Sequence, residues 1–215
     1  MQFIDLSHTI VDAMVTYPGL PGPVISDHLG RVASRERYAP GTEFQIGRID
    51  MVANTGTYID TPFHRFADGH DLSALALERV AFVPAVLVDA KGPAIDAGVF
   101  AGLDFTDRAV IIRTGWDAHW GTPAYGAGGH PHLTAAAAQA LVAAGVAVVG
   151  IDSVNIDATS TGERPVHTTL LAQGIPIVEH LRGLEQIPSG SFTFTAVPVK
   201  VNGMGTFPVR AFATI

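Results

Sequence analysis

Polar and metal-capable side chains gather in one short segment between Asn54 and His64. In an extended backbone alternate side chains share a face, so we expect Asn54, Tyr58 and Asp60 to point the same way, with Gly56 leaving room between them. Such a face could bind a substrate or a metal ion, and the imidazole of His64 could transfer protons. The segment alone is equally consistent with a polar strand edge that runs into a proline turn.

Two further metal-capable residues lie next to apolar segments: His167 near the start of a predicted helix, and Glu179 at the end of the strand expected after it. Strand ends are where ligands bind in α/β sheets. Taken singly, His167 could cap or pack, and Glu179 could be a solvated residue. As a pair of metal-capable groups beside apolar elements, they favour a functional site over these separate explanations.

The elements that must position these side chains follow from hydrophobic patterning. Residues 134–144 are predicted to form a helix, because a threonine can cap an alanine-rich segment that ends before a glycine. The apolar run 146–151 then predicts a strand buried on both faces. A second helix and strand are expected at 166–173 and 175–178.

Three more strands are expected at 85–90, 109–113 and 191–200. Residues 115–132 are rich in Gly, Pro and aromatic side chains and predict a long functional loop, in which Trp116 could line a substrate pocket. The sequence therefore predicts a single α/β domain over residues 1–215, with a mixed β-sheet and few helices.

Composition limits the classes of function. The chain has no cysteine, so a metal ion must be held by His, Asp and Glu side chains. A net charge of -7 without clustered Lys and Arg argues against nucleic-acid binding and favours a small-molecule partner. Apolar stretches are far shorter than the ~20 residues of a membrane span. The first residues, Met1 to Asp5, do not resemble a signal peptide, so we expect no membrane association and a cytoplasmic location.

The segment 54–64 resembles the signature of the cyclase or kynurenine formamidase-like metal-dependent hydrolases, His-x-Gly-Thr-His-x-Asp-x-Pro-x-His. Five of its seven fixed positions match. The seven positions fall on Asn54, Gly56, Thr57, Tyr58, Asp60, Pro62 and His64. Shorter matches to the family run from one end of the chain to the other, at residues 5–8, 17–19, 113–116, 150–152 and 208–210. The resemblance implies a swivelling β/β/α fold and a homo-oligomer.

The resemblance also implies roles for individual residues. Family members hold one metal ion with the first two signature His and the Asp, and can hold a second with that Asp and a downstream His and Glu. Asp60, His167 and Glu179 retain the second set, and the last signature His, His64, keeps the acid/base position. Asn54 and Tyr58 replace the two His of the first set. The implied activity is hydrolysis of a small amide, lactone or cyclic acyl substrate with one Zn or Mn ion per chain.

Two alternatives remain open at this point. Asn54 and Tyr58 are hydrogen-bond donors, so with Asp60 and His64 they could serve a metal-free lyase or cyclase. A rewritten site could also bind a metabolite without converting it. Among the other histidines, His8 is interpreted as a structural hydrogen-bonding residue. His28, His70 and His180 have no partner that the sequence identifies and are interpreted as surface residues.

Overall fold

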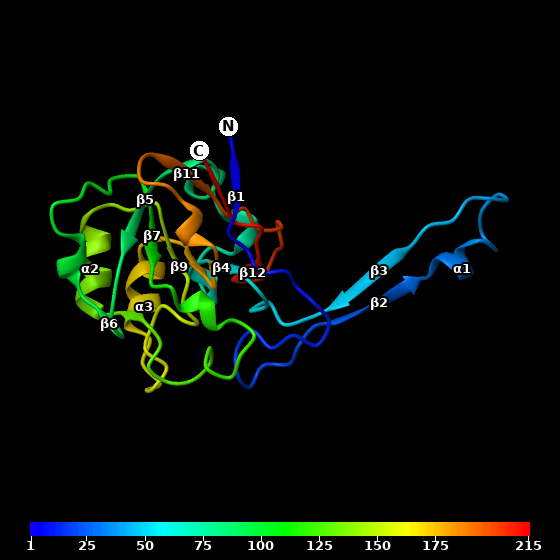
Figure 1. Ribbon diagram of the computed structural model, residues 1–215, viewed down its shortest axis with the longest axis horizontal. Helices are drawn as coiled ribbons and strands as arrows, with labels where there is room; N and C mark the ends of the chain where they lie inside the picture. The colour runs from blue at the N-terminus through cyan, green and yellow to red at the C-terminus, as the bar shows by residue number, and fades with distance from the viewer.

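The computed structural model describes residues 1–215 and contains a curled nine-stranded mixed sheet (Figure 1). Its strands are β1 (Phe3–Asp5), β4 (Tyr58–Asp60), β5 (Val83–Asp89), β7 (Ala109–Arg113), β9 (Val148–Ile151), β10 (Ile177–Glu179), β11 (Phe192–Thr195), β12 (Thr206–Pro208) and β13 (Phe212–Thr214). The strand order is β1-β13-β11-β5-β7-β9-β10-β4-β12. With only three α-helices, this architecture confirms the predicted mixed-sheet α/β fold.

Smaller elements complete the chain. The α-helices are α1 (Arg31–Ser34), α2 (Ala135–Ala143) and α3 (Pro165–Ala172), and two short sheets pair β2 (Val24–Leu29) with β3 (Ile46–Asp50) and β6 (Ala94–Ile95) with β8 (His132–Leu133). The 3-10 helices are η1 (Pro62–His64), η2 (Leu72–Ala74), η3 (Leu77–Arg79), η4 (Ala97–Phe100), η5 (Trp116–His119) and η6 (Leu184–Gln186). None of the helices is both long and apolar enough to cross a lipid bilayer. The predicted cytoplasmic location stays a prediction.

The centre of the sheet is parallel and buried on both faces. Strands β5, β7, β9 and β10 run parallel, whereas β4 pairs antiparallel with β10 on one side and β12 on the other. Along β7, Val110 and Ile112 belong to the same apolar cluster as the buried residues of α2 and α3, and Ile111 belongs to the cluster on the opposite face. Uninterrupted apolar runs such as 109–112 follow from this two-sided burial.

The predicted helices and strands are present with small shifts at their ends. Thr134 caps α2 by accepting a hydrogen bond from the Ala137 amide at 3.2 Å. The strand expected at 191–200 ends at Thr195, and only an isolated bridge to Val209 follows at Pro198. Proline has no amide hydrogen to contribute to a strand ladder, so a regular strand does not continue through Pro198.

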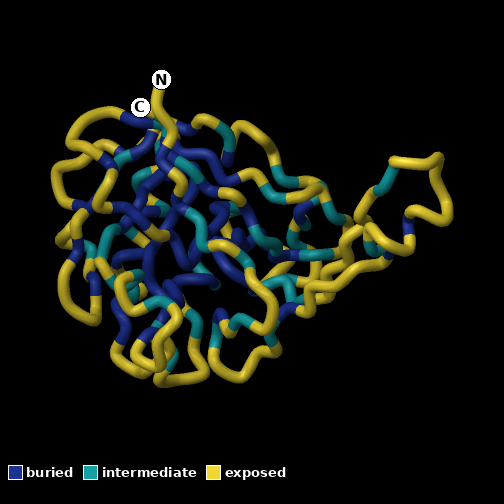
Figure 2. The backbone as a smooth tube through the Cα atoms, turned by 45° about the vertical axis from the view of Figure 1, so that its right-hand side comes forward, coloured by how far each residue is buried: buried dark blue, intermediate teal, exposed yellow.

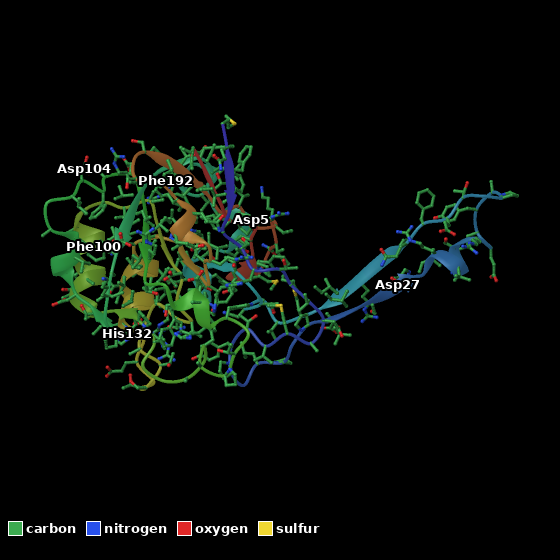
Figure 3. The ribbon with its side chains drawn as sticks, in the orientation of Figure 1. Asp5, Asp27, Phe100, Asp104, His132 and Phe192 are labelled. Atoms are coloured by element: carbon green, nitrogen blue, oxygen red, sulfur yellow. The ribbon has the colours of Figure 1, made fainter.

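A long arm projects from the body of the protein and was not predicted (Figure 1). It consists of β2, α1 and β3, and every residue of β3 is exposed. Apolar side chains lie on both of its strands and on α1, and Val32 is 74% exposed. Figure 2 shows the arm almost entirely in the colour of exposed residues, and Asp27 on β2 lies far from the other labelled side chains in Figure 3.

Candidate active site

Strand β4 places two polar side chains between two neighbouring strands. Tyr58 and Asp60 lie on one face of β4, because Ile59 between them points into the core on the other face. The antiparallel registers set Tyr58 opposite Glu179 of β10 and Asp60 opposite Thr206 of β12. Directly opposed residues are the closest neighbours across a sheet. Accordingly, the Tyr58 hydroxyl donates to Glu179 Oε2 at 2.6 Å and the Thr206 hydroxyl donates to Asp60 Oδ1.

His167 reaches this pair of carboxylates from the first turn of α3. Pro165 opens the helix, and the side chain of Asp157 accepts hydrogen bonds from the amides of Val166 at 2.8 Å and His167 at 2.9 Å. The same carboxylate lies 2.7 Å from Nδ1 of the His167 ring. The other ring nitrogen, Nε2, is 3.7 Å from Asp60 Oδ2 and 3.6 Å from Glu179 Oε1. Asp157 therefore fixes the ring so that Nε2 meets both acids.

His64 lies at the more open side of the site, on η1. Its Nδ1 is 2.8 Å from the Thr206 hydroxyl, and its side chain is 36% exposed. The single proton of that hydroxyl goes to Asp60, so the hydroxyl oxygen must accept the hydrogen bond from His64 Nδ1. The neutral His64 ring then carries its proton on Nδ1 and keeps a free lone pair on Nε2. A free imidazole lone pair is what a general base needs.

The donor set fits a divalent cation. Asp60 Oδ2 is buried and has no hydrogen-bond partner in the protein, which is costly for a carboxylate oxygen without a compensating ligand. Ligand atoms of Asp60, His64 and His167 all lie within 4.8 Å of one another. Glu179 also borders His167, although its two oxygens already accept hydrogen bonds from Tyr58 and from the Ile156 amide. Imidazole and carboxylate ligands of this kind suit Zn and Mn.

Burial and charge shift the pKa values of these groups in the metal-free chain. Burial alone would raise the pKa of Asp60, but the imidazoles of His167 and His64 lower it below its usual value. Burial raises the pKa of Glu179 to about 7. Burial would lower the pKa of His167, but Asp157 and the two site carboxylates outweigh it and raise that pKa to about 10. In the metal-free chain the protonated His167 ring therefore supplies the positive charge beside Asp60 and Glu179 that a bound metal cation would otherwise supply.

The predicted extended segment 54–60 is wrong for its first half. Gly56 has φ +67, in the left-handed region, and the strand begins only at Tyr58. A side chain at Gly56 would also approach Ile10, which explains why glycine fits there. The half-buried Asn54 nevertheless lies near the Tyr58 phenol, since its amide acts to lower the pKa of that phenol against the larger raising effect of burial. The structure thus brings Asn54 to the site by a turn.

The two tryptophans of the long loop lie in different surroundings. The indole N–H of Trp116 donates to the backbone oxygen of Tyr125 at 3.0 Å, so this ring packs within its own loop. Trp120 instead packs near His180, with ring centres 5.8 Å apart, and the ring centres of His180 and Tyr58 are 5.1 Å apart. A substrate-binding role for Trp116 remains a prediction.

Several site residues escaped the sequence analysis. Asp157 and Thr206 orient His167 and His64, yet neither belongs to a recognisable pattern with its partner. The interpretation of His180 as a surface residue is wrong, because the residue is fully buried, whereas His28 and His70 are exposed as expected. The position of His180 directly after Glu179 in a buried strand was the one available signal.

Comparisons with known proteins agree with this geometry. The cyclase family model matches residues 4–158, and the chain belongs to that family. Kynurenine formamidase of Salinibacter ruber is 27% identical over 98% of this chain and 96% of its own length. The solved structure of a potential metal-dependent hydrolase with cyclase activity is 25% identical, with a TM-score of 0.80 over 99% of this chain and 96% of that one.

A more distant structure shares the fold alone. Isatin hydrolase A from Ralstonia solanacearum is 22% identical, with a TM-score of 0.81 over 99% of this chain and 91% of that one. The family assignment and the predicted hydrolase class both agree with the relatives.

Proposed function

We propose that this protein is a metal-dependent hydrolase that opens the acyl C–N or C–O bond of a small amide, lactone or cyclic acyl substrate. The observation that carries the proposal is the buried, unpartnered Oδ2 of Asp60 beside Nε2 of His167. A buried carboxylate oxygen facing an imidazole nitrogen that is oriented by a second carboxylate is a common arrangement of metal ligands. The names of the relatives support hydrolysis of an amide.

In this proposal Asp60, His167 and Glu179 hold one Zn or Mn ion. When bound, the metal ion would supply Lewis-acid activation of water and of the substrate carbonyl. Asp157 holds His167 with Nε2 toward the other two ligands. Tyr58 donates to Glu179 and fixes the direction of that carboxylate. Burial raises the pKa of Tyr58 well above its usual value, so its phenol keeps its proton and does not replace the missing imidazole as a ligand.

His64 is the proposed general acid and base. Its Nε2 takes a proton from the attacking water and returns it to the leaving nitrogen or oxygen, while Nδ1 stays bonded to Thr206. Asp60 orients the Thr206 hydroxyl by accepting its proton in a hydrogen bond. The oxygen of that hydroxyl accepts from His64 Nδ1, so Asp60 orients the His64 ring through Thr206. Asn54, beside the Tyr58 hydroxyl, is placed to bind a polar group of the substrate through its amide.

The geometry argues against a metal-free lyase that uses Tyr58 as its electrophile. A phenol has one proton to donate, and that of Tyr58 already goes to Glu179 at 2.6 Å. A substrate oxyanion at Tyr58 would have to compete with a buried carboxylate. Activity that survives complete removal of divalent metal by a chelator would nonetheless favour that alternative.

Metal content tests the hydrolase proposal directly. After loading with Zn or Mn and washing, elemental mass spectrometry should find about one metal ion per chain, and His167→Ala should abolish it. His70→Ala is the matched control, because His70 is exposed and outside the site. His64→Ala should keep the metal but lower turnover of an amide by about 10²-fold or more. A metal-free wild-type protein, or full activity in His64→Ala, would contradict the proposal.

We also propose a homo-oligomer in which the arm contacts a second copy. The arm exposes apolar side chains on both strands, including Ile46 at 47% and Ile49 at 48% exposure. Apolar surface of this kind on an extended arm favours burial against a partner. Light scattering coupled to size exclusion should report an oligomer for the wild type, and a smaller species when Ile46 and Ile49 are both changed to Ser. A wild-type monomer would refute the proposal.

A further inference from the structure

His180 occupies an unusual position next to the candidate active site. Its side chain is fully buried, and its backbone has φ +57, a left-handed conformation that few non-glycine residues adopt. The backbone is held there by a hydrogen bond from its amide to the Ser153 oxygen at 3.3 Å and by one from the Thr57 hydroxyl to its own oxygen at 2.6 Å. The surrounding fold therefore fixes a residue that a surface role would not require.

The hydroxyl group of Thr57 is hydrogen-bonded to the backbones of both His180 and His8. Thr57 donates to the His180 backbone oxygen and accepts from the amide of His8 at 3.0 Å. Residues 8 and 180 are far apart in the chain, and they meet on either side of the segment that leads into Tyr58. The ring of Tyr58 lies 5.1 Å from that of His180, so the pair adjoins the residues proposed to hold the metal ion.

Both rings carry a buried nitrogen that has no hydrogen-bond partner within the chain. Nε2 of His180 and Nε2 of His8 are each buried and accept or donate no hydrogen bond within the chain. Buried polar nitrogens are nearly always paired, so an unpaired one indicates a missing ligand or water. Two such atoms, on rings that both pack against Trp120, and a third at Asp60 Oδ2 in the neighbouring candidate site indicate a polar molecule that binds in this region.

The proton position on His180 follows from its neighbour. Tyr125 is buried, and its hydroxyl lies 2.8 Å from His180 Nδ1, which is the one hydrogen-bond partner of that hydroxyl. A buried phenol must donate its proton, so Tyr125 donates and Nδ1 accepts. The proton of the neutral His180 ring is then on Nε2. This nitrogen is a donor and requires an acceptor, such as an oxygen atom.

The aromatic ring of Trp120 packs against the imidazoles of His8 and His180. Trp120 stacks on His8 with ring centres 3.7 Å apart and planes within 10°, and its edge contacts Tyr125 at 4.9 Å and His180 at 5.8 Å. This packing leaves the two imidazoles little freedom to turn. A donor that is fixed before a ligand arrives loses little entropy on binding.

We propose that His180 and His8 form a substrate-binding subsite, in which His180 Nε2 donates to a carbonyl or carboxylate oxygen of the ligand and His8 Nε2 contacts a second polar atom beside it. The assignment rests on the proposed hydrolase function for its substrate class, which is a small acyl compound. The hydrogen-bonding argument itself does not depend on a metal ion. The subsite binds the part of the substrate that is not attacked, and His180 is a binding residue, not a catalytic one.

Two amide variants of different length separate the two nitrogens of His180. In His180→Asn the amide replaces Nδ1 and keeps a partner for Tyr125, but no atom reaches the position of Nε2. Asparagine also tolerates the left-handed backbone, so the variant should fold. In His180→Gln the longer amide reaches the Nε2 position and can donate from there. His70→Asn, at an exposed histidine, is the control for the same chemical change.

Calorimetric titration of the metal-free protein with benzamide and with benzoate tests the subsite. The wild type and His70→Asn should bind at least one probe, His180→Asn should bind it about tenfold more weakly, and His180→Gln should recover part of the loss. Benzamide binding would identify a neutral carbonyl, and benzoate binding a carboxylate. A wild type that binds neither probe, or a His180→Asn variant that binds as well as the wild type, overturns the proposal.

The result is independent of the metal measurement. If the wild type retains no metal ion, the hydrolase proposal fails, but probe binding by the metal-free chain still decides the subsite. If His180→Asn retains the metal ion and loses probe affinity, the two roles are separate, as proposed. Nitrogen-15 spectra of the imidazoles give a second measurement, since the Nε2 proton of His180 should shift when a probe binds and stay unchanged when it does not.

Discussion

Replacing Asp157 by asparagine should reveal how strongly the orientation of one ring controls metal binding. One oxygen of this buried carboxylate accepts from the Val166 amide at 2.8 Å, and the other accepts both from the His167 amide at 2.9 Å and from its Nδ1 at 2.7 Å. Asparagine offers one oxygen and one NH2 group. In either orientation the NH2 group faces at least one N–H donor, so at least one buried donor loses its partner.

The magnitudes follow from that geometry. Leaving a buried donor unsatisfied costs roughly 1–3 kcal/mol, so the free energy of unfolding of the metal-free protein should fall by about that much. Loss of a carboxylate partner of a metal-binding imidazole typically weakens metal affinity by about 10–100-fold. Denaturant unfolding measures the first quantity, and competition with a chromophoric zinc chelator measures the second.

Asp96→Asn provides the matched control. Asp96 also accepts a backbone amide hydrogen bond at the start of a short helix, from Ala97 at 2.8 Å, but it is the N-cap of η4 and lies outside the candidate active site. It should lose some stability and no zinc affinity. If Asp157→Asn binds zinc as tightly as the wild type, His167 is not held by Asp157 for metal binding, and the proposed role of this pair is refuted.

Four further results are expected. Metal affinity should rise about tenfold per pH unit between pH 7 and pH 10. The reason is that the pKa of His167 is about 10 in the metal-free chain, so a bound metal ion must displace the proton of that ring. A zinc affinity that does not change with pH would contradict this. The same raised pKa stabilises the metal-free fold below pH 6.5, and this contribution should disappear in thermal unfolding as the pH rises toward 10. Changing Asn54 and Tyr58 together to His should raise the metal content to about two ions per chain, whereas a constant content by elemental analysis would show that more than these two ligands is missing. Thr206→Val should keep the metal ion and lower kcat about tenfold or more, because His64 loses the hydrogen bond that holds its proton on Nδ1. An unchanged kcat would show that this threonine has no role in the mechanism.

Local patterns in the sequence predicted the central elements well. Helix α2 has its cap, its alanines and its terminal glycine within one short stretch, and β7 is a continuous apolar run at the centre of the sheet. Such signals depend only on neighbours along the chain. The arm escaped prediction because β2 and β3 are stabilised by each other across a long connection, and neither has a buried face that would produce alternation of apolar and polar residues.

The residues of the candidate site likewise fall into those that the sequence predicts and those that it does not. Asp60 and His64 were found through a sequence signature, His167 and Glu179 were found through their places beside predicted apolar elements and through the family resemblance, and the structure brings the four together. Asp157 and Thr206 could not be found, because their importance comes from partners that only the tertiary fold supplies. His180 was misjudged for the same reason, since its burial depends on residues from three distant segments.

The register of β4 also has a consequence for folding kinetics. The Tyr58 to Glu179 hydrogen bond joins residues 121 positions apart, and the Thr206 to Asp60 bond joins residues 146 positions apart. Contacts of such long sequence separation form only after large loops have closed. We therefore expect the site to assemble late, after the local helices and the central parallel strands. A metal ion bound to it should slow unfolding while leaving the folding rate almost unchanged, as is typical of interactions absent from the transition state.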